Sequence, residues 1–203
     1  MKCSVTRWRR WLRSRFTGDR GRAATFLPTD HLEHMIRDTR TYLELRSLGD
    51  LQRGVPPAAL PDIVRLERCT GSLFRHLYSE VGRHYRWTDR LAWTDEEIQC
   101  HLANPAVHMW LARWQDEPAG YFELRSYPDR SVQLVYLGLR PDFIGRGWGK
   151  VLLVRAADEA WWLGATRMWL HTSTFDHAAA LPNYLKRGFQ LFHSETLYLG
   201  TPA

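Results

Sequence analysis

The sequence has no long hydrophobic run, few cysteines and no internal repeat. No uninterrupted apolar stretch among its 203 residues approaches the ~20 residues of a membrane-spanning helix. Its three cysteines, Cys3, Cys69 and Cys100, are odd in number and far apart, which disfavours a disulfide framework and provides no CxxC metal site. We therefore expect a soluble, cytoplasmic protein without a metal.

The positive charge of the chain is concentrated at its start. The net charge is +6, but residues 1–22 hold eight lysines and arginines against Asp19 alone, which gives 8 − 1 = +7 and leaves −1 for residues 23–203. A nearly neutral body disfavours a nucleic-acid-binding protein. Apolar residues recur at helical spacing from Trp8 to Phe16, so membrane contact by an amphipathic leader helix stays an alternative to a mobile leader.

We expect residues 1–40 to be a basic leader and residues 41–203 to form a single domain. The length of the chain fits one hydrophobic core. Alternating residues at Thr41–Leu48 predict an edge strand, and a proline-rich link leads to a second strand at Asp62–Arg68.

Two helices are expected next. Ser72 is a plausible N-cap for a helix through about Tyr85, and Thr94 with Glu97 forms a capping box for another helix to about Ala103.

The following region predicts an antiparallel meander and then a parallel crossover. Strand patterns occupy Val107–Trp114, Ala119–Arg125 and Val132–Leu139, with turn residues between them. Small and apolar residues then recur at helical spacing from Leu153 to Gly164, before a strand at Arg167–His171. Strand, helix and strand at this spacing form a right-handed crossover.

A short helix ending near Gly188 and a last strand at Gln190–Tyr198 complete the chain's pattern. The predicted fold class is therefore α/β, with one mixed sheet.

The most informative stretch is Leu137–Lys150, LGLRPDFIGRGWGK, in which a strand enters a glycine-rich loop that opens a helix. Such a loop directs main-chain N–H groups and the positive end of the helix dipole at an anion. A P-loop is excluded because Gly145 and Gly149 enclose only three residues and Val151 replaces the hydroxyl residue; a dinucleotide fingerprint needs its third glycine one place after Gly149. A tight chain reversal without a ligand stays an alternative.

This loop resembles motif A of the GNAT superfamily of acetyl-CoA-dependent N-acetyltransferases. The pattern [Q/R]-x-x-G-x-G/A falls on Ile144–Gly149, where Gly147 and Gly149 match and Ile144 departs from it.

A second stretch, His171–Phe189, resembles motif B of the same superfamily. Its alanine, tyrosine and closing glycine–phenylalanine are matched by Ala180, Tyr184, Gly188 and Phe189. The usual asparagine is replaced by His177, and Pro182 is an unexpected residue that would kink or restart the helix.

The resemblance implies a GNAT-like fold: a splayed sheet with helices on both faces, which takes acetyl-CoA as co-substrate. The pantetheine arm would pair with main-chain groups at the strand edge, and the pyrophosphate would rest on the glycine loop. The residues implied for the cofactor are Leu137, Leu139, Ile144, Gly145, Arg146, Gly147, Trp148, Gly149, Lys150 and His177.

Acetyl transfer by direct attack needs one base and one acid, because the amine must lose a proton and the departing thiolate gains one. Tyr184 occupies the position of the family's acid, and its alternative is a buried aromatic residue. Glu123 is the candidate base, with a solvated strand residue as its alternative; Tyr136 and His171 compete for the role.

In this family the loop between the first two helices covers the acceptor. Here that loop is His84–Trp93, so Tyr85, Trp87 and Trp93, together with Tyr136, are candidate substrate-binding residues. The alternative is that the tryptophans pack onto the meander.

The function expected is transfer of acetyl from acetyl-CoA to a small-molecule amine. Acetylation of a protein N-terminus or lysine, and a non-catalytic coenzyme A sensor, stay as alternatives. A homodimer is compatible with the sequence but is not indicated by it.

Overall fold

The computed structural model describes residues 35–200. Residues 37–197 form one compact unit. The basic leader and its amphipathic-helix alternative lie outside the described residues, apart from residues 35–40, which form part of a strand.

The described residues form one mixed sheet with helices packed on it. The sheet has seven strands in the order β2-β3-β4-β5-β6-β1-β7. The strands are β1 (Met35–Leu45), β2 (Asp62–Arg65), β3 (Val107–Trp114), β4 (Glu117–Ser126), β5 (Ser131–Leu139), β6 (Arg167–Ser173) and β7 (Gln190–Gly200); the helices are α2 (Gly71–Gly82), α3 (Asp95–Leu102), α4 (Trp148–Trp162) and α5 (Ala180–Lys186). This confirms the expected α/β class.

The meander and the crossover are confirmed. β3, β4 and β5 pair antiparallel, and β5 then pairs parallel with β6 after the chain passes through α4. The β3–β4 turn places Gln115 and Asp116 at φ 49° and 68°, the left-handed pair that suits a two-residue hairpin.

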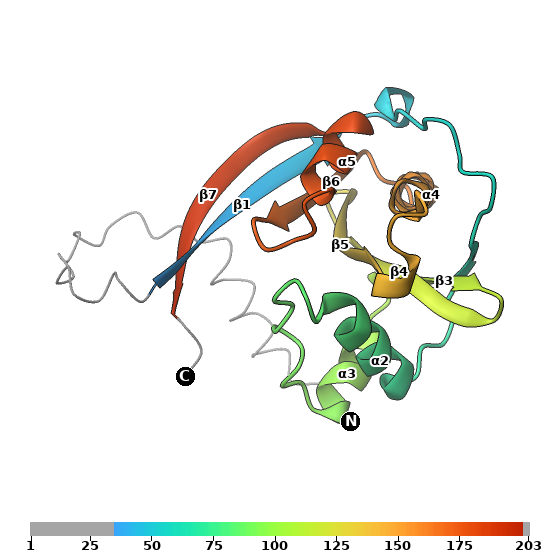
Figure 1. Ribbon diagram of the computed structural model, residues 1–203, viewed down its shortest axis with the longest axis vertical. Helices are drawn as coiled ribbons and strands as arrows, with labels where there is room; N and C mark the ends of the chain where they lie inside the picture. Colours follow the sequence, from blue (N-terminus) through green and yellow to red (C-terminus); the bar gives the residue numbers. More distant parts are fainter. Residues whose placement is uncertain (1–34, 201–203) are drawn as a thin grey trace, which may run out of the picture. The chain divides into compact units, whose positions relative to one another are not determined.

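Alternating residues of the sheet pack into two separate hydrophobic clusters. On β4, Phe122 and Leu124 pack in a cluster with the buried face of α4, whereas Tyr121 packs with residues of α2 and α3. The period of two along a strand sends neighbouring side chains to opposite faces. Figure 1 shows α4 and α5 on one side of β3–β5 and α2 and α3 on the other, which confirms helices on both faces.

β1 is not the edge strand that the sequence predicts. It lies between β6 and β7, begins six residues before the expected position, and pairs antiparallel with β6 from Arg40↔Ser173 to Leu45↔Met168. Its buried Asp38 accepts a hydrogen bond from the Ser173 hydroxyl at 2.6 Å. A charged side chain in an interior strand is stable there because the neighbouring strand supplies its partners.

The structure corrects the predicted N-cap of α2 and shows where α5 begins relative to Pro182. The N-cap of α2 is Thr70 rather than Ser72, because the Thr70 hydroxyl accepts the Leu73 N–H at 3.2 Å. In α5, Pro182 occupies the first turn, where its missing N–H has no intrahelical role, so the helix begins just before it. The Thr94 capping box of α3 is confirmed.

The sequence predicts neither a membrane-spanning helix nor a disulfide framework. Among residues 35–200 no helix is long and apolar enough to cross a bilayer. Cys69 is a free thiol.

Candidate active site

β5 and β6 run side by side at one end and separate at the other. They pair only where Ser131–Leu134 meets Arg167–Leu170; the remaining five residues of β5 and three of β6 are not paired with each other. The described sheet therefore opens between its two central parallel strands, as the family resemblance implies.

The open half of β5 directs main-chain groups into this gap. The Arg140 N–H donates to the Ala119 carbonyl at 2.9 Å, and the register then pairs Gly138 across from Tyr121. Because alternate residues of an antiparallel pair exchange hydrogen bonds, Gly138 bonds toward β4, and the N–H and C=O groups of Leu137 and Leu139 point away from β4. An extended ligand could add to this edge as a further strand would.

A glycine-rich loop with an uncapped helix start follows directly. Gly145 and Gly147 have φ of 87° and 76°, and no side chain caps α4. A Cβ built at Gly145 or Gly149 would meet no atom within 4 Å, so the loop is open on the side that these glycines face. The first N–H groups of α4 have no intrahelical acceptor and carry the positive end of the helix dipole. This arrangement of open glycines and unpaired N–H groups suits a pyrophosphate.

The side chains of the loop contribute unequally. Trp148 is buried, donates from Nε1 to the Ala59 carbonyl at 2.8 Å and stacks on Phe143, so it can offer a cofactor only its main-chain N–H. The Arg146 guanidinium carbon lies 5.1 Å from the centre of the Phe143 ring, with the side chain exposed. Ile144 is exposed as well, and Lys150 is half-buried.

α5 brings Tyr184 close to the same helix start. The neighbouring Asn183 donates from Nδ2 to the Gly149 carbonyl at 3.3 Å, which ties α5 to the first turn of α4. Tyr184 is buried, with its ring edge-on to Phe189. Burial first, and the negative charge of Asp176 second, raise the pKa of Tyr184. Its phenol is therefore protonated at neutral pH, as a proton donor requires.

Glu123 is engaged in a buried ion pair. Its carboxylate accepts two hydrogen bonds from the Arg90 guanidinium, at 2.5 and 2.8 Å, and one oxygen lies 3.1 Å from Nε2 of His101. Burial alone would raise the pKa of Glu123, but the charges and hydrogen bonds of Arg90 and His101 hold that pKa well below its usual range. A carboxylate so stabilised and fully buried is a poor proton acceptor, so this geometry favours a structural role.

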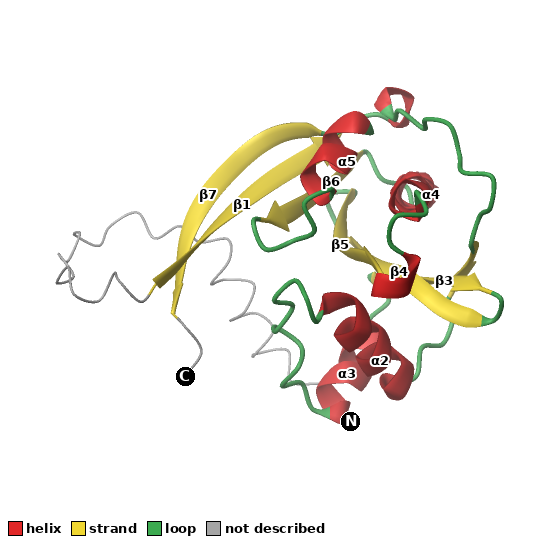
Figure 2. Cartoon of the chain, in the orientation of Figure 1, coloured by secondary structure: helices red, strands yellow, loops and turns green. Residues whose placement is uncertain are grey.

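The loop between α2 and α3 lies over the open end of the sheet. The Trp87 ring packs 4.7 Å from that of Tyr136 on β5, while Trp87 Nε1 lies 3.5 Å from Asp176, in the loop after β6. The Tyr85 ring lies edge-on to His177 at 6.2 Å. Both loops are drawn in green in Figure 2. The structure thus brings together predicted acceptor residues and the predicted cofactor residue His177.

Two candidates occupy other surroundings. Trp93 stacks on Phe74 of α2, 6.2 Å away, in the cluster that α2 and α3 form with the sheet. His171 faces β1, where its ring lies 5.5 Å from Tyr42.

Sequence reasoning overlooked Asp176 and Tyr121. The Tyr121 hydroxyl is buried beneath Trp87 of the loop between α2 and α3, here called the acceptor loop, and has no hydrogen-bond partner among the described residues. Nothing in the alternating pattern of β4 indicates this. Asp176 directly precedes the motif B position of His177, and its acidic side chain was the available signal.

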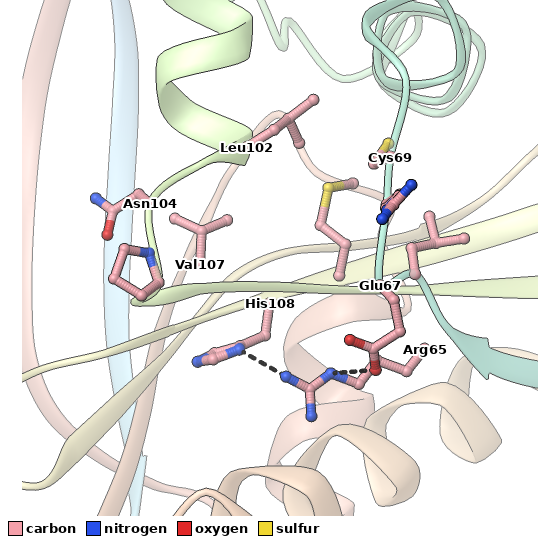
Figure 3. Close-up of a pocket in the computed structure, with 11 residues that line it drawn as sticks. Arg65, Glu67, Cys69, Leu102, Asn104, Val107 and His108 are labelled. Carbon is pink, nitrogen blue, oxygen red and sulfur yellow. Dashed lines mark hydrogen bonds and ion pairs between the residues drawn. The ribbon is translucent and has the colours of Figure 1, made fainter. Parts of the chain in front are cut away.

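A separate surface pocket contains none of the predicted site residues. Its Arg65 is occupied, since the guanidinium lies 3.3 Å from Nδ1 of His108 and 3.5 Å from Glu67 (Figure 3). The pocket is lined by Arg65, Leu66, Glu67, Arg68, Cys69, Leu102, Asn104, Pro105, Val107, His108 and Met109. No group of three metal-binding side chains occurs in the part of the chain that the structure describes.

Several solved structures share this fold. A GCN5-related N-acetyltransferase from Kribbella flavida is 20% identical, with a TM-score of 0.55 over 81% of this chain and 58% of that protein. A Bacillus subtilis acetyltransferase in complex with CoA is 20% identical, with a TM-score of 0.50 over 70% and 99%. An aminoglycoside acetyltransferase from an uncultured soil metagenomic sample is 15% identical, with a TM-score of 0.51 over 62% and 86%.

These likenesses establish the fold, and the family rests on a separate match. The chain spans 51–62% of the length of the first structures that it matches. No curated protein matches it significantly. The model of the acetyltransferase (GNAT) family matches residues 73–189, a range that includes the glycine-rich loop and Tyr184. This match covers more than half of the sequence, and the chain therefore belongs to the GNAT family of acetyltransferases.

Proposed function

We propose that this protein transfers the acetyl group of acetyl-CoA to a primary amine of a small molecule by direct attack. The observation that carries the proposal is the convergence of three features on one place. The open edge of β5 leads into the uncapped start of α4, and the Asn183–Gly149 hydrogen bond ties α5, which carries Tyr184, to that same start.

The residues divide the task by their position. The main-chain groups of Leu137 and Leu139 hold the pantetheine arm, and the N–H groups of Gly145–Lys150 hold the pyrophosphate. Acetyl-CoA supplies a thioester whose carbonyl the neutral amine attacks. Tyr184 gives its proton to the departing thiolate, which needs an acid that is protonated at neutral pH.

The proton of the attacking amine leaves through water in this proposal. Glu123 is unsuited to receive it, because Arg90 and His101 already stabilise its charged form. Tyr136 is half-buried under Trp87, and burial raises its pKa well above that of an ordinary phenol, so its neutral oxygen serves to position a water rather than to hold the proton.

The residues of the acceptor loop between α2 and α3 favour a small-molecule acceptor. Tyr85 and Trp87 cover the open end of the sheet at close range to β5 and to the loop after β6. The similarity in fold to a structure named as an aminoglycoside acetyltransferase agrees with a small amine-bearing acceptor. The decisive experiment measures thiol release from acetyl-CoA against a panel of small amines and of peptides with free N-termini or lysines. Release with peptides alone would contradict the small-molecule acceptor, and release with neither would favour the sensor.

We expect acetyl-CoA, but neither NAD nor ATP, to raise the melting temperature, because a ligand that binds only the folded state stabilises it. Gly147→Val should abolish this shift, since a β-branched residue is strained at φ 76° and would displace the loop. Gly164→Val is the matched control: Gly164 has φ 87° with no atom near its Cβ, but lies at the other end of α4. An unchanged acetyl-CoA shift in the Gly147 variant would place the cofactor elsewhere.

Removing residues 1–22 should leave acetyl transfer intact, because the first strand begins at Met35 and the family match begins at residue 73. Turnover of the purified truncated protein is the measurement. A larger deletion of residues 1–45 should abolish folding, since it removes β1 from between β6 and β7. A folded but inactive protein lacking residues 1–22 would contradict the expectation, and vesicle binding lost on truncation would support the membrane-contact alternative.

A further inference from the structure

Asp176 has one saturated oxygen and one that is nearly free. Its Oδ2 accepts hydrogen bonds from the Thr172 hydroxyl and the Ser173 N–H, both at 2.8 Å, which fixes the plane of the carboxylate. Its Oδ1 has the Trp87 Nε1 as its contact, at 3.5 Å, which is at the limit for a hydrogen bond. A fixed carboxylate with an unsaturated oxygen is able to accept a further donor.

The charge of Asp176 is not neutralised by its neighbours. No lysine, arginine or histidine among residues 35–200 forms an ion pair with it. Arg86, on the facing loop, instead places its guanidinium 4.8 Å from the centre of the Phe175 ring. By contrast, the buried carboxylate of Glu123 is paired with Arg90.

The position of Asp176 connects the acceptor loop with the candidate acid. Its indole neighbour Trp87 belongs to the loop that covers the open end of the sheet, and Tyr85 of the same loop lies against the adjacent His177. The negative charge of Asp176 contributes to raising the pKa of both Tyr85 and Tyr184, after the larger effect of burial. The carboxylate therefore lies within electrostatic range of both sides of the site.

We propose that Asp176 is a specificity-determining residue that binds an ammonium group of the acceptor, with Trp87 as the aromatic wall beside it. This rests on the proposed acetyl transfer and deepens it. The ammonium bound is one that does not react, because a neighbouring carboxylate favours the charged form of an amine and so opposes its attack. The acceptor class is therefore a compound with at least two amines, one charged at Asp176 and the other free to attack the thioester.

The test compares 1,4-diaminobutane with 1-aminobutane as probes of equal chain length. Binding to the protein saturated with coenzyme A is measured by calorimetry in the wild type and in Asp176→Asn. The asparagine keeps an oxygen for the Thr172 and Ser173 bonds but removes the charge. The diamine Kd should rise about 10- to 100-fold, the size of a lost charge-assisted hydrogen bond, while the monoamine and coenzyme A Kd values stay within about twofold.

A matched control separates binding from turn formation. Asp129 also accepts a main-chain N–H and a hydroxyl, both from Ser131, at the opposite end of β5. Asp129→Asn should leave the diamine Kd unchanged, and Asp176→Glu should restore part of the lost affinity. An unchanged diamine Kd in Asp176→Asn, or equal weakening of diamine, monoamine and coenzyme A, would overturn the inference. Diamine binding that depends on Asp176, without acetyl transfer to any amine, would contradict the proposed activity and leave this binding site standing.

Discussion

Replacement of Tyr184 by phenylalanine is expected to lower kcat by about 100-fold or more, with the affinity for acetyl-CoA nearly preserved. The change keeps the buried ring and its contact with Phe189 but removes the one group that we assign to protonating the thiolate. Loss of a general acid acts in the transition state, so kcat falls rather than ground-state binding. Steady-state kinetics under conditions in which chemistry limits the rate provide the measurement.

The pH dependence sharpens this prediction. Because burial raises the pKa of Tyr184, its proton-bearing form persists beyond the pH of ~10 at which an ordinary phenol ionises. A decline in wild-type rate assigned to this residue must therefore begin above that pH and be absent from the variant. Tyr127→Phe, which removes a hydroxyl bonded to Gln133 instead, is the control and should keep wild-type kcat. Wild-type turnover by a folded Tyr184→Phe protein would reduce Tyr184 to a core aromatic residue.

Substitution of Glu123 by glutamine is expected to destabilise the fold by about 3–5 kcal/mol, because it leaves the buried guanidinium of Arg90 without a countercharge. Chemical denaturation gives the free energy of unfolding directly. The exposed pair of Asp62 and Arg113 is the comparison, and Asp62→Asn should cost at most ~1 kcal/mol. Glu123→Leu combined with Arg90→Met should recover much of the loss, since no buried charge remains.

The same pair gives a signed pH effect. The pKa of Glu123 is lower in the folded protein than in the unfolded chain, so its stabilisation is complete above the unfolded value of ~4.3 and is lost as the pH falls further. The Glu123→Gln protein should lack this part of the acid dependence. If instead the variant keeps its stability and loses its activity, Glu123 is the general base after all.

The meander, the crossover and the glycine loop are predictable because each depends on local signals. The strand alternation of β3–β5, the small-residue stripe of α4 and the glycines at 145 and 147 all lie within short windows of sequence. The structure adds that these two glycines have positive φ, which explains why the loop needs them.

The remaining features depend on partners far along the chain. The isolated sequence of β4 presents Glu123 as a strand residue, and only the fold brings Arg90, 33 residues away, to its carboxylate. In the same way Asp176 and Trp87 are 89 residues apart. The position of β1 could not be read locally either, since an alternating strand fits an edge or an interior position equally well.

Because β1 lies in the interior of the sheet, its native pairing must wait until the strands on either side of it have been synthesised. Asp38 and its partner Ser173 are 135 residues apart, so during synthesis β1 emerges long before the strands that flank it. Until β6 and β7 exist, β1 is a strand with both hydrogen-bonding edges exposed, and such edges recruit other chains. Pairing between segments so far apart in sequence closes a long loop, which slows folding. We therefore expect the yield of native protein to depend on keeping β1 from pairing with other protein chains until β6 and β7 have been synthesised. An exposed strand of this kind is a natural target for a chaperone.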